Sequence, residues 1–298
     1  LDFGSNPESS EGYRLLKSAG FEVMIIDHHP YDAQCSDCPV NDEGPNHRFI
    51  DVYLSPWILK GSTDELDLSK YTAGYLTVEV ARLLGIDEGK AKRLAAIALS
   101  GDRSPLEYDK DDDTSLVFDY VARYSMFPNK LKFYESILDR EELRQSILVQ
   151  AKEKITEVLK LGLRLLKVSE FDIDSTDKLI LGTVNMEKIT KRSEFPSKSK
   201  SVGVLFDHLC DKYPGHSVVM LGHGGRMITF RINTTAMQHG YSARELIKEI
   251  KYEFPDFVIS GGGHDKAASV RLLCPDYTEI ILNWLKERIT GNKPHICL

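Results

Sequence analysis

The sequence predicts an α/β protein in which a domain built on a parallel sheet is joined by a long helix to a smaller α+β C-terminal domain. Three observations predict this class. A continuous apolar run near residue 25 ends in polar side chains, as does a strand buried on both faces of a parallel sheet. An amphipathic stretch without proline begins at residue 139, and beyond it short apolar runs alternate with turn residues.

The first domain is expected over residues 1–138. Its strand is the run Val23–Ile26, and Glu11–Ala19 before it fits a short crossover helix. Two further segments, Ala73–Leu84 and Glu88–Leu99, have apolar residues at helical spacing, and the second ends at Ser100-Gly101-Asp102-Arg103. Open α/β sheets bind ligands beyond the C-terminal ends of their strands. The polar residues after the predicted strand are therefore candidates for a site.

The connecting helix is expected over residues 139–171, and the C-terminal domain over residues 172–298. Apolar residues recur along the helix at spacings near three and four. The C-terminal domain then begins with short apolar runs typical of strands, at Leu179–Leu181, Val202–Phe206, Ser217–Leu221 and Met227–Ile232. A hairpin turn is predicted at residues 222–225, and helices at Ala243–Glu253 and Tyr277–Ile289.

Composition excludes several classes of protein. The chain has 298 residues with 38 Lys and Arg against 45 Asp and Glu, a net charge of −7 that is atypical of proteins that coat nucleic acid. No apolar run approaches the roughly 18–20 residues of a membrane span, and no secretory signal opens the chain. Five cysteines do not form a disulfide framework. We therefore expect a cytoplasmic protein that does not enter the membrane.

Charge is distributed unequally along the chain. Residues 1–150 contain 16 basic and 27 acidic side chains, whereas residues 151–298 contain 22 and 18. This asymmetry favours a division of labour between the two halves. The acidic half would bind cations, and the mildly basic half would bind an anionic substrate.

The first group of candidate site residues is Asp2, Asp27-His28-His29 and Asp102. Each is expected at the end of a strand or helix. A set of carboxylate and imidazole ligands suits Mn²⁺ or a similar divalent ion, whereas a structural zinc site would need thiolates. Two such ions, about 3.5–4 Å apart, activate a water and neutralise a phosphate oxygen. The alternative is that Asp27 caps a turn, that Asp102 caps the next segment, and that His28 and His29 lie on the surface.

The second group is Ser260-Gly261-Gly262-Gly263-His264, which follows a short apolar run. Consecutive glycines let a backbone approach a ligand closely, and their N–H groups at the start of a following helix would bind a phosphate. The alternative is an ordinary turn.

In this order, the two groups resemble the DHH phosphoesterases with a DHH-associated C-terminal domain. That superfamily includes RecJ exonucleases, oligoribonuclease/pAp phosphatases and cyclic-dinucleotide phosphodiesterases. The resemblance covers almost the whole chain. The family's Asp-x-Gly-Ser motif matches Asp2-Phe3-Gly4-Ser5, and its later Asp after a helix matches Asp102. Ser269 departs from the pattern, since the family usually has glycine there.

The resemblance implies a role for each matching residue. A two-metal site for Mn²⁺, with Mg²⁺ as the alternative ion, would have Asp2, His28 and Asp102 as ligands. The catalytic residues would be Asp27, His28 and His29. Substrate would be bound by His29, Arg231, Gly261, Gly262, Gly263 and His264.

One departure concerns the start of the chain. The family's first metal-ligand motif, expected upstream of Asp2, is absent, so we expect these residues to belong to a longer protein that supplies it. The leading hypothesis is a Mn²⁺-dependent, RecJ-like phosphodiesterase or exonuclease acting on single-stranded nucleic acid or short oligonucleotides. The alternative is a catalytically degenerate scaffold or nucleic-acid-binding subunit, with partner proteins in replication or repair.

Two further motifs have open alternatives. Cys35 and Cys38, with His47 nearby, would bind zinc or be ordinary loop thiols. The basic stretch from Lys188 to Lys200 would contact a nucleic-acid backbone or be a solvated loop.

Overall fold

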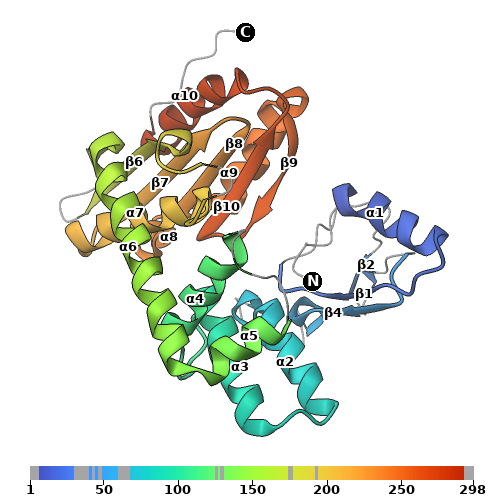
Figure 1. The fold of residues 1–298 in the computed structure, drawn as a ribbon. Coiled ribbons are helices and arrows are strands. Elements are labelled where there is room, and N and C mark those ends of the chain that lie inside the picture. Colours follow the sequence, from blue (N-terminus) through green and yellow to red (C-terminus); the bar gives the residue numbers. More distant parts are fainter. Residues whose placement is uncertain are drawn as a thin grey trace. The chain divides into compact units, whose positions relative to one another are not determined.

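The structure is a computed structural model that describes residues 7–29, 40–41, 44–45, 49–59, 68–124, 127, 131–173, 177–191 and 194–291. The chain divides into two compact units, Leu1–Asp119 (unit 1) and Tyr120–Leu298 (unit 2), each of which is described by itself. Asp2, Cys35, Cys38 and His47 lie outside the described residues. The predicted α/β class is confirmed, with a parallel strand pair in unit 1 and a mixed sheet in unit 2 (Figure 1).

Unit 1 is built on a parallel pair of strands, β1 and β4, with Met24 opposite Val52 and Ile26 opposite Leu54. The predicted strand is therefore confirmed, but it is not buried on both faces along its whole length, because Met24 is half exposed. The elements are α1 (Pro7–Ser18), β1 (Met24–Ile26), β2 (Val40–Asn41), β3 (Gly44–Pro45), β4 (Val52–Leu54), two 3₁₀ turns, η1 (Pro56–Leu59) and η2 (Leu68–Lys70), α2 (Ala73–Leu83), α3 (Glu88–Gly101) and α4 (Asp112–Arg123), whose last turn belongs to unit 2.

Asp51 holds α1 against the two strands. Its carboxylate accepts hydrogen bonds from Lys17 Nζ at 2.6 Å and from the N–H of Val23 at 2.6 Å. The hydrogen bond from Lys17 is the main cause of a lowered pKa for Asp51. The N–H of Asp51 in turn donates to the carbonyl of Val23 at 2.8 Å. One residue thus fixes the start of both strands relative to the preceding helix.

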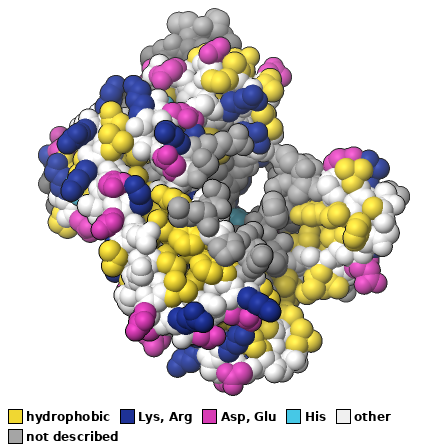
Figure 2. Space-filling model, viewed as in Figure 1, with side chains coloured by type: hydrophobic (Ala, Val, Ile, Leu, Met, Phe, Trp, Pro, Cys, Tyr) yellow, Lys and Arg dark blue, Asp and Glu magenta, His cyan; other side chains and the backbone are white. Residues whose placement is uncertain are grey.

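One end of this small sheet is apolar and exposed. Met24 and Val52, which are opposite one another in the register, are about half exposed, as are Phe21, Leu15 and Leu16. Figure 2 shows hydrophobic side chains gathered over the surface formed by α1, β1 and β4. Ile25 and Ile26, by contrast, are buried.

Unit 2 is a six-stranded sheet with strand order β5-β6-β7-β8-β10-β9. Only β6 and β7 pair in parallel among the described strands of this unit, and the other neighbours are antiparallel. The elements are α5 (Leu131–Asp139), α6 (Glu141–Leu165), β5 (Lys167–Asp172), β6 (Lys178–Asn185), η3 (Met186–Lys188), α7 (Lys198–Lys212), β7 (Ser217–Gly224), β8 (Met227–Ile232), α8 (Thr234–Gln238), α9 (Ala243–Glu253), η4 (Pro255–Phe257), β9 (Val258–Gly263), β10 (Ala267–Leu272) and α10 (Tyr277–Thr290).

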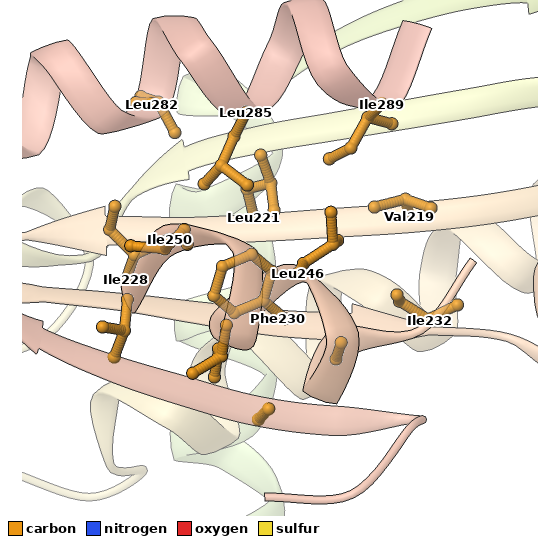
Figure 3. Packing of buried hydrophobic residues seen from close by; sticks show 14 of the residues in the cluster. Val219, Leu221, Ile228, Phe230, Ile232, Leu246, Ile250, Leu282, Leu285 and Ile289 are labelled. Atoms are coloured by element: carbon orange, nitrogen blue, oxygen red, sulfur yellow. The ribbon is translucent and has the colours of Figure 1, made fainter. Parts of the chain in front are cut away.

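Helices cover both faces of the sheet in unit 2. On one face, Leu221 of β7 and Phe230 of β8 pack against α9 and α10, including Leu285, which is fully buried (Figure 3). On the other face, alternate residues such as Val218 and Met220 pack against α6 and α7. Because successive strand residues point to opposite faces, nearly every position in the central strands is buried. This explains why the central strands appear in the sequence as continuous apolar runs.

The predicted connecting helix is too long at its C-terminal end. It begins at Glu141, close to the expected residue 139, but ends at Leu165 instead of near residue 171. Leu166 is already extended, and Lys167–Asp172 pairs antiparallel with β6 as strand β5. The hydrogen bonds available at the sheet edge outweigh an apolar spacing that would have continued the helix.

The strand-like run Val202–Phe206 is also corrected, because it lies in helix α7. Ser197 caps this helix by accepting a hydrogen bond from the N–H of Lys200 at 3.2 Å. Leu205 and Leu209 then lie on the buried face of the helix. A short apolar run is compatible with either structure, and here the cap and the packing decide for the helix.

The predicted hairpin turn is shorter than expected. Strand β7 continues through Gly224, which pairs with Met227, and only Gly225 and Arg226 form the loop. The predicted helices at residues 243–253 and 277–289 are confirmed as α9 and α10. No helix in the described part of the chain combines the length and apolarity needed to cross a membrane.

Gly222 allows α7 to lie close against β7. A Cβ added at Gly222 would lie 2.1 Å from Val202 Cγ2 and 3.1 Å from Met186 Sδ. We predict that Gly222→Ala lowers the free energy of unfolding of unit 2 by about 1–3 kcal/mol, because the helix must shift outward. The measurement is urea denaturation followed by Trp284 fluorescence in a Trp57→Phe background. Val202→Ala removes the clashing methyl groups. The loss of unfolding free energy in the double variant should therefore be smaller than the sum of the losses in the two single variants, and a strictly additive loss would contradict this account.

Asp177, at the start of β6, joins three elements of unit 2. Its Oδ2 accepts from Ser217 Oγ at 2.6 Å, its Oδ1 accepts from the N–H of Ser217 at 3.0 Å, and His216 and His239 lie at 3.3 and 2.9 Å. Burial alone would raise the pKa of Asp177, but the hydrogen bonds from Ser217 and His216 outweigh it and lower the pKa below its ordinary value of 3.8.

A lowered pKa in the folded state makes stability depend on pH. The contribution of Asp177 is complete above its unfolded-state pKa and is lost as the pH falls through the lower pKa of the folded state. We predict that Asp177→Asn destabilises unit 2 at pH 7 and that its difference from the wild type shrinks below about pH 4. Thermal unfolding between pH 2 and 7 measures this. Asp211→Asn, at an exposed position in α7, is the control, and an unchanged difference at low pH would contradict the prediction.

Candidate functional site

The candidate site in unit 1 begins where β1 ends. Asp27, His28 and His29 follow the last strand residue directly, and the N–H of Asp27 continues the ladder by donating to Leu54 O at 3.0 Å. Asp27 is completely buried and His28 is 6% exposed. Burying an ionisable side chain is costly unless it has partners. These residues are therefore held in defined positions.

Asp27 has one satisfied and one unsatisfied carboxylate oxygen. Its Oδ1 accepts from the N–H of His28 at 2.9 Å, from the N–H of His29 at 3.3 Å and from His29 Nδ1 at 2.8 Å. Its Oδ2 is buried and has no hydrogen-bond partner among the described residues. A buried carboxylate oxygen of this kind requires a donor or a cation.

The ring of His28 is oriented by the backbone of η2. His28 Nδ1 lies 2.9 Å from the carbonyl oxygen of Ser69, which only accepts, so Nδ1 holds the proton and Nε2 presents its lone pair. This is the arrangement typical of histidines that bind metals. Trp57 fixes the backbone of the same residue, because its Nε1 donates to His28 O at 2.8 Å.

The two histidines lie close together. Their ring centroids are 4.7 Å apart with an interplanar angle of 71°, and each offers a ring nitrogen within 4.8 Å of one on the other. His29 Nδ1 lies 2.8 Å from the carboxylate of Asp27, which only accepts, so Nδ1 holds a proton and Nε2 faces away from Asp27. In both rings Nδ1 is thus held by a supporting residue, Ser69 for His28 and Asp27 for His29, and Nε2 is the nitrogen that faces away from it. This arrangement suits a divalent cation or a phosphate-bearing ligand.

The turn η2 also holds the segment that contains Asp102. Ser104 Oγ donates to the carbonyl of Lys70 at 2.6 Å, and the neighbouring carbonyl, of Ser69, is the one that faces His28. Asp102 is the exposed C-cap residue of α3, two positions before Ser104. The structure therefore ties the segments of two predicted metal ligands to consecutive carbonyl groups of one turn. The third predicted ligand, Asp2, lies outside the described residues.

The glycine run lies in unit 2 at an edge of the sheet. Gly261, Gly262 and Gly263 belong to β9, which pairs with β10 only, among the strands that the structure describes. Gly263 has φ +138°, and a Cβ there would lie 2.5 Å from Ala267 O, so no other residue fits. A Cβ at Gly262 would meet nothing within 4 Å. The backbone at Gly262 is therefore open to close approach.

The prediction that a helix follows the glycine run is wrong. His264 and Ala267 exchange two backbone hydrogen bonds, of 2.8 and 3.1 Å, across a tight turn that leads into strand β10. The reason is the burial of alternate residues, Ala268, Val270 and Leu272, in the core of unit 2, which requires the strand period of two. The glycine run is therefore followed by a hairpin turn and strand β10, and not by the helix N-terminus that was expected to bind phosphate.

Arg231 lies on β8, as predicted, opposite Ala267 of β10. Its Nη1 donates to Phe230 O at 2.9 Å, and its Nη2 donates to Ser199 Oγ at 2.8 Å. Ser199 belongs to the first turn of α7, within the predicted basic stretch. Two lysines of that stretch, Lys198 and Lys191, form ion pairs with Glu187 and Glu194.

Several residues that build these sites were missed by sequence reasoning. Trp57, Ser69, Lys70 and Ser104 support the segments of His28 and Asp102, and Ser199 supports Arg231. Ser69 and Lys70 act through their backbone carbonyls, which any residue provides, so no residue type marks them. Both carbonyls belong to η2, a 3₁₀ turn of three residues, which is too short to show the apolar periodicity that predicts a helix or strand. Cys210 and Cys274, distant candidates for a zinc site, are not in disulfides.

Comparison with known proteins identifies the fold. No protein-family model matches the chain. The uncharacterized protein MJ1198 of Methanocaldococcus jannaschii is 24% identical over 312 residues, covering 92% of this chain, which spans 39% of that protein's length. A structure of RecJ of Thermus thermophilus in complex with Mn²⁺ is 14% identical, with a TM-score of 0.49, over 99% of this chain and 44% of RecJ. The DHH domain of a protein described as a member of a family of ribosomal proteins gives a TM-score of 0.81 at 24% identity, over 97% of this chain and 68% of that one. This chain therefore has the fold of a DHH domain.

Proposed function

We propose that this chain is a metal-dependent phosphoesterase that hydrolyses phosphodiester bonds at the end of single-stranded nucleic acid or in short oligonucleotides. The observation that supports this most directly is the buried Asp27, whose Oδ2 has no partner among the described residues, beside two histidines with fixed tautomers. A core carboxylate of this kind is costly to fold unless it serves a cation or substrate. The proposed location is the cytoplasm.

The residues present fit a divalent cation. His28 Nε2 and the carboxylates of Asp102 and Asp2 would be its ligands. Nitrogen and oxygen donors without thiolates favour Mn²⁺, with Mg²⁺ as the alternative. A bound divalent ion would polarise a water and neutralise charge on a phosphate oxygen. The chain's own contribution is to hold the ligand atoms in place through η2 and Trp57.

Asp27 and His29 act as a pair in this proposal. Asp27 Oδ1 holds the N–H at His29 Nδ1, which leaves His29 Nε2 to contact the scissile phosphate. The two backbone N–H groups that also donate to Oδ1 stop the carboxylate from rotating. His29 is thereby oriented toward substrate without spending binding energy on ordering its ring.

Substrate binding is assigned to unit 2. The open edge of β9 at Gly262 allows a phosphate or a terminal nucleotide to approach the backbone of Gly261, Gly262 and Gly263. His264 follows in the hairpin turn. Arg231 lies on strand β8 of the same sheet and donates a hydrogen bond to Ser199 of α7. A small group of donors of this kind suits a short single strand better than a long duplex.

The first test is hydrolysis of a panel of substrates with Mn²⁺. Fluorescently labelled single-stranded DNA, single-stranded RNA, a cyclic dinucleotide and pAp are compared, with EDTA and with Mn²⁺ restored. We predict cleavage of a single strand or short oligonucleotide that EDTA abolishes. His28→Ala and Asp27→Asn should each lower kcat/KM at least about 100-fold, while circular dichroism remains unchanged.

His208→Ala, a partly buried histidine in α7, is the matched control and should retain wild-type turnover. Undiminished hydrolysis by His28→Ala would refute the assignment of the site. A wild-type protein that binds oligonucleotides but hydrolyses none of the panel with Mn²⁺ or Mg²⁺ would favour the alternative, a catalytically degenerate nucleic-acid-binding scaffold.

A second prediction concerns the support of His28. Trp57→Phe removes the hydrogen bond to His28 O but retains an aromatic ring in the same place. We predict an approximately 10-fold weaker affinity for Mn²⁺, measured by isothermal titration calorimetry without substrate. Trp284→Phe, in the core of unit 2, is the matched control and should leave Mn²⁺ affinity unchanged. Equal affinities for wild type and Trp57→Phe would show that the indole is not needed for metal binding.

A further inference from the structure

Arg103 has an unusual backbone conformation beside the candidate metal site. Its φ is +52°, and it is the one non-glycine residue with positive φ in the part of the chain that the structure describes. The left-handed region is unfavourable for a residue with a Cβ. Backbone strain of this kind concentrates at functional sites, where the side chain supplies something that glycine cannot.

The strain arises from the way α3 ends. The N–H of Ser104 donates to Leu99 O at 2.9 Å, and the N–H of Arg103 donates to Ser100 O at 3.1 Å. This pair of hydrogen bonds is the Schellman motif, which places Arg103 at the position where glycine is strongly preferred. The nearby glycine, Gly101, lies two positions too early and instead faces α4, where a Cβ would be 3.2 Å from Ser115 Oγ.

The turn is held firmly in this conformation. Ser104 Oγ donates to Lys70 O at 2.6 Å, and Lys110 Nζ donates to the carbonyl of Ser104. Arg103 is exposed and follows Asp102 directly, and both are attached through Ser104 to the turn whose Ser69 carbonyl faces His28. A fixed backbone thus positions a permanent positive charge next to a proposed metal ligand.

We propose that Arg103 binds a phosphate group of the substrate at the metal site. This inference rests on the proposed phosphoesterase function and adds a substrate-binding residue in unit 1. A guanidinium remains charged at all relevant pH values and donates to two phosphate oxygens at once, so it suits this role better than lysine does. The strained backbone is retained because glycine, which the turn prefers, would remove the guanidinium.

The test uses substitutions that separate strain from charge. Arg103→Gly should raise the thermal midpoint of unit 1, followed by Trp57 fluorescence in a Trp284→Phe background, by a few degrees, because it relieves the left-handed strain. The same variant should raise KM by about 10- to 100-fold, with a smaller effect on kcat. Arg103→Ala should raise KM equally without the gain in stability, and Arg103→Lys should fall between Ala and wild type.

Arg14→Ala, which removes an exposed arginine from α1 of the same unit, is the matched control and should leave KM unchanged. Mn²⁺ affinity measured without substrate should be the same in wild type and Arg103→Gly, because Arg103 is not a ligand. A stabilised Arg103→Gly with wild-type KM would overturn the inference and leave Arg103 a purely structural residue.

A separate measurement distinguishes this failure from failure of the proposed function. Binding of a labelled single-stranded oligonucleotide in the presence of Mn²⁺, followed by fluorescence anisotropy, does not require turnover. If the wild type binds without hydrolysing and Arg103→Gly binds about 10-fold more weakly, the proposed hydrolysis fails and the role of Arg103 stands. Equal binding by both proteins overturns the role of Arg103 whether or not the wild type is active.

Discussion

The candidate site of unit 1 depends on two consecutive carbonyl groups in the 3₁₀ turn η2. Ser69 O faces His28 Nδ1, and Lys70 O accepts from Ser104 Oγ. These two hydrogen bonds connect the end of β1 with the end of α3, although the two segments are far apart in sequence. They orient the ring of a proposed metal ligand and fix the turn that contains Asp102 and Arg103. Displacing η2 would therefore disturb the whole site at once.

Unit 2 achieves a comparable rigidity through packing. Its sheet is covered on both faces, and helix α7 lies close enough to β7 that Gly222 has no room for a Cβ. This support reaches the sheet edge that contains the glycine run, because β10 packs into the core against α9 and β9 pairs with β10. The glycine run is thus an exposed edge on a rigid scaffold, the combination that precise ligand binding requires.

Local pattern was sufficient where one signal dominated. The strand before Asp27 and the amphipathic helices α2, α3, α9 and α10 were predicted correctly, because the short-range pattern of apolar residues matches the observed element there. Pattern failed where tertiary contacts had to decide between two structures. The apolar run of α7 suits a strand or a helix, and the residues of β5 continue a helical spacing but pair with β6. The glycine run was predicted to adopt a backbone conformation that requires glycine, which Gly263 does, but the element that follows it was not predictable from glycine alone.

The sequence by itself determined the chemistry available: two groups of polar residues, one rich in carboxylate and imidazole and one rich in glycine, in the order found in DHH proteins. Residue types and spacing are properties of the chain and need no fold to be recognised. Only the tertiary structure decided how these groups are arranged, namely the orientation of the His28 ring, the unsatisfied oxygen of Asp27 and the strained turn at Arg103. The reason is physical, since hydrogen bonds to backbone carbonyls and the conformation of a turn depend on neighbours that are distant in sequence and leave no mark on residue type.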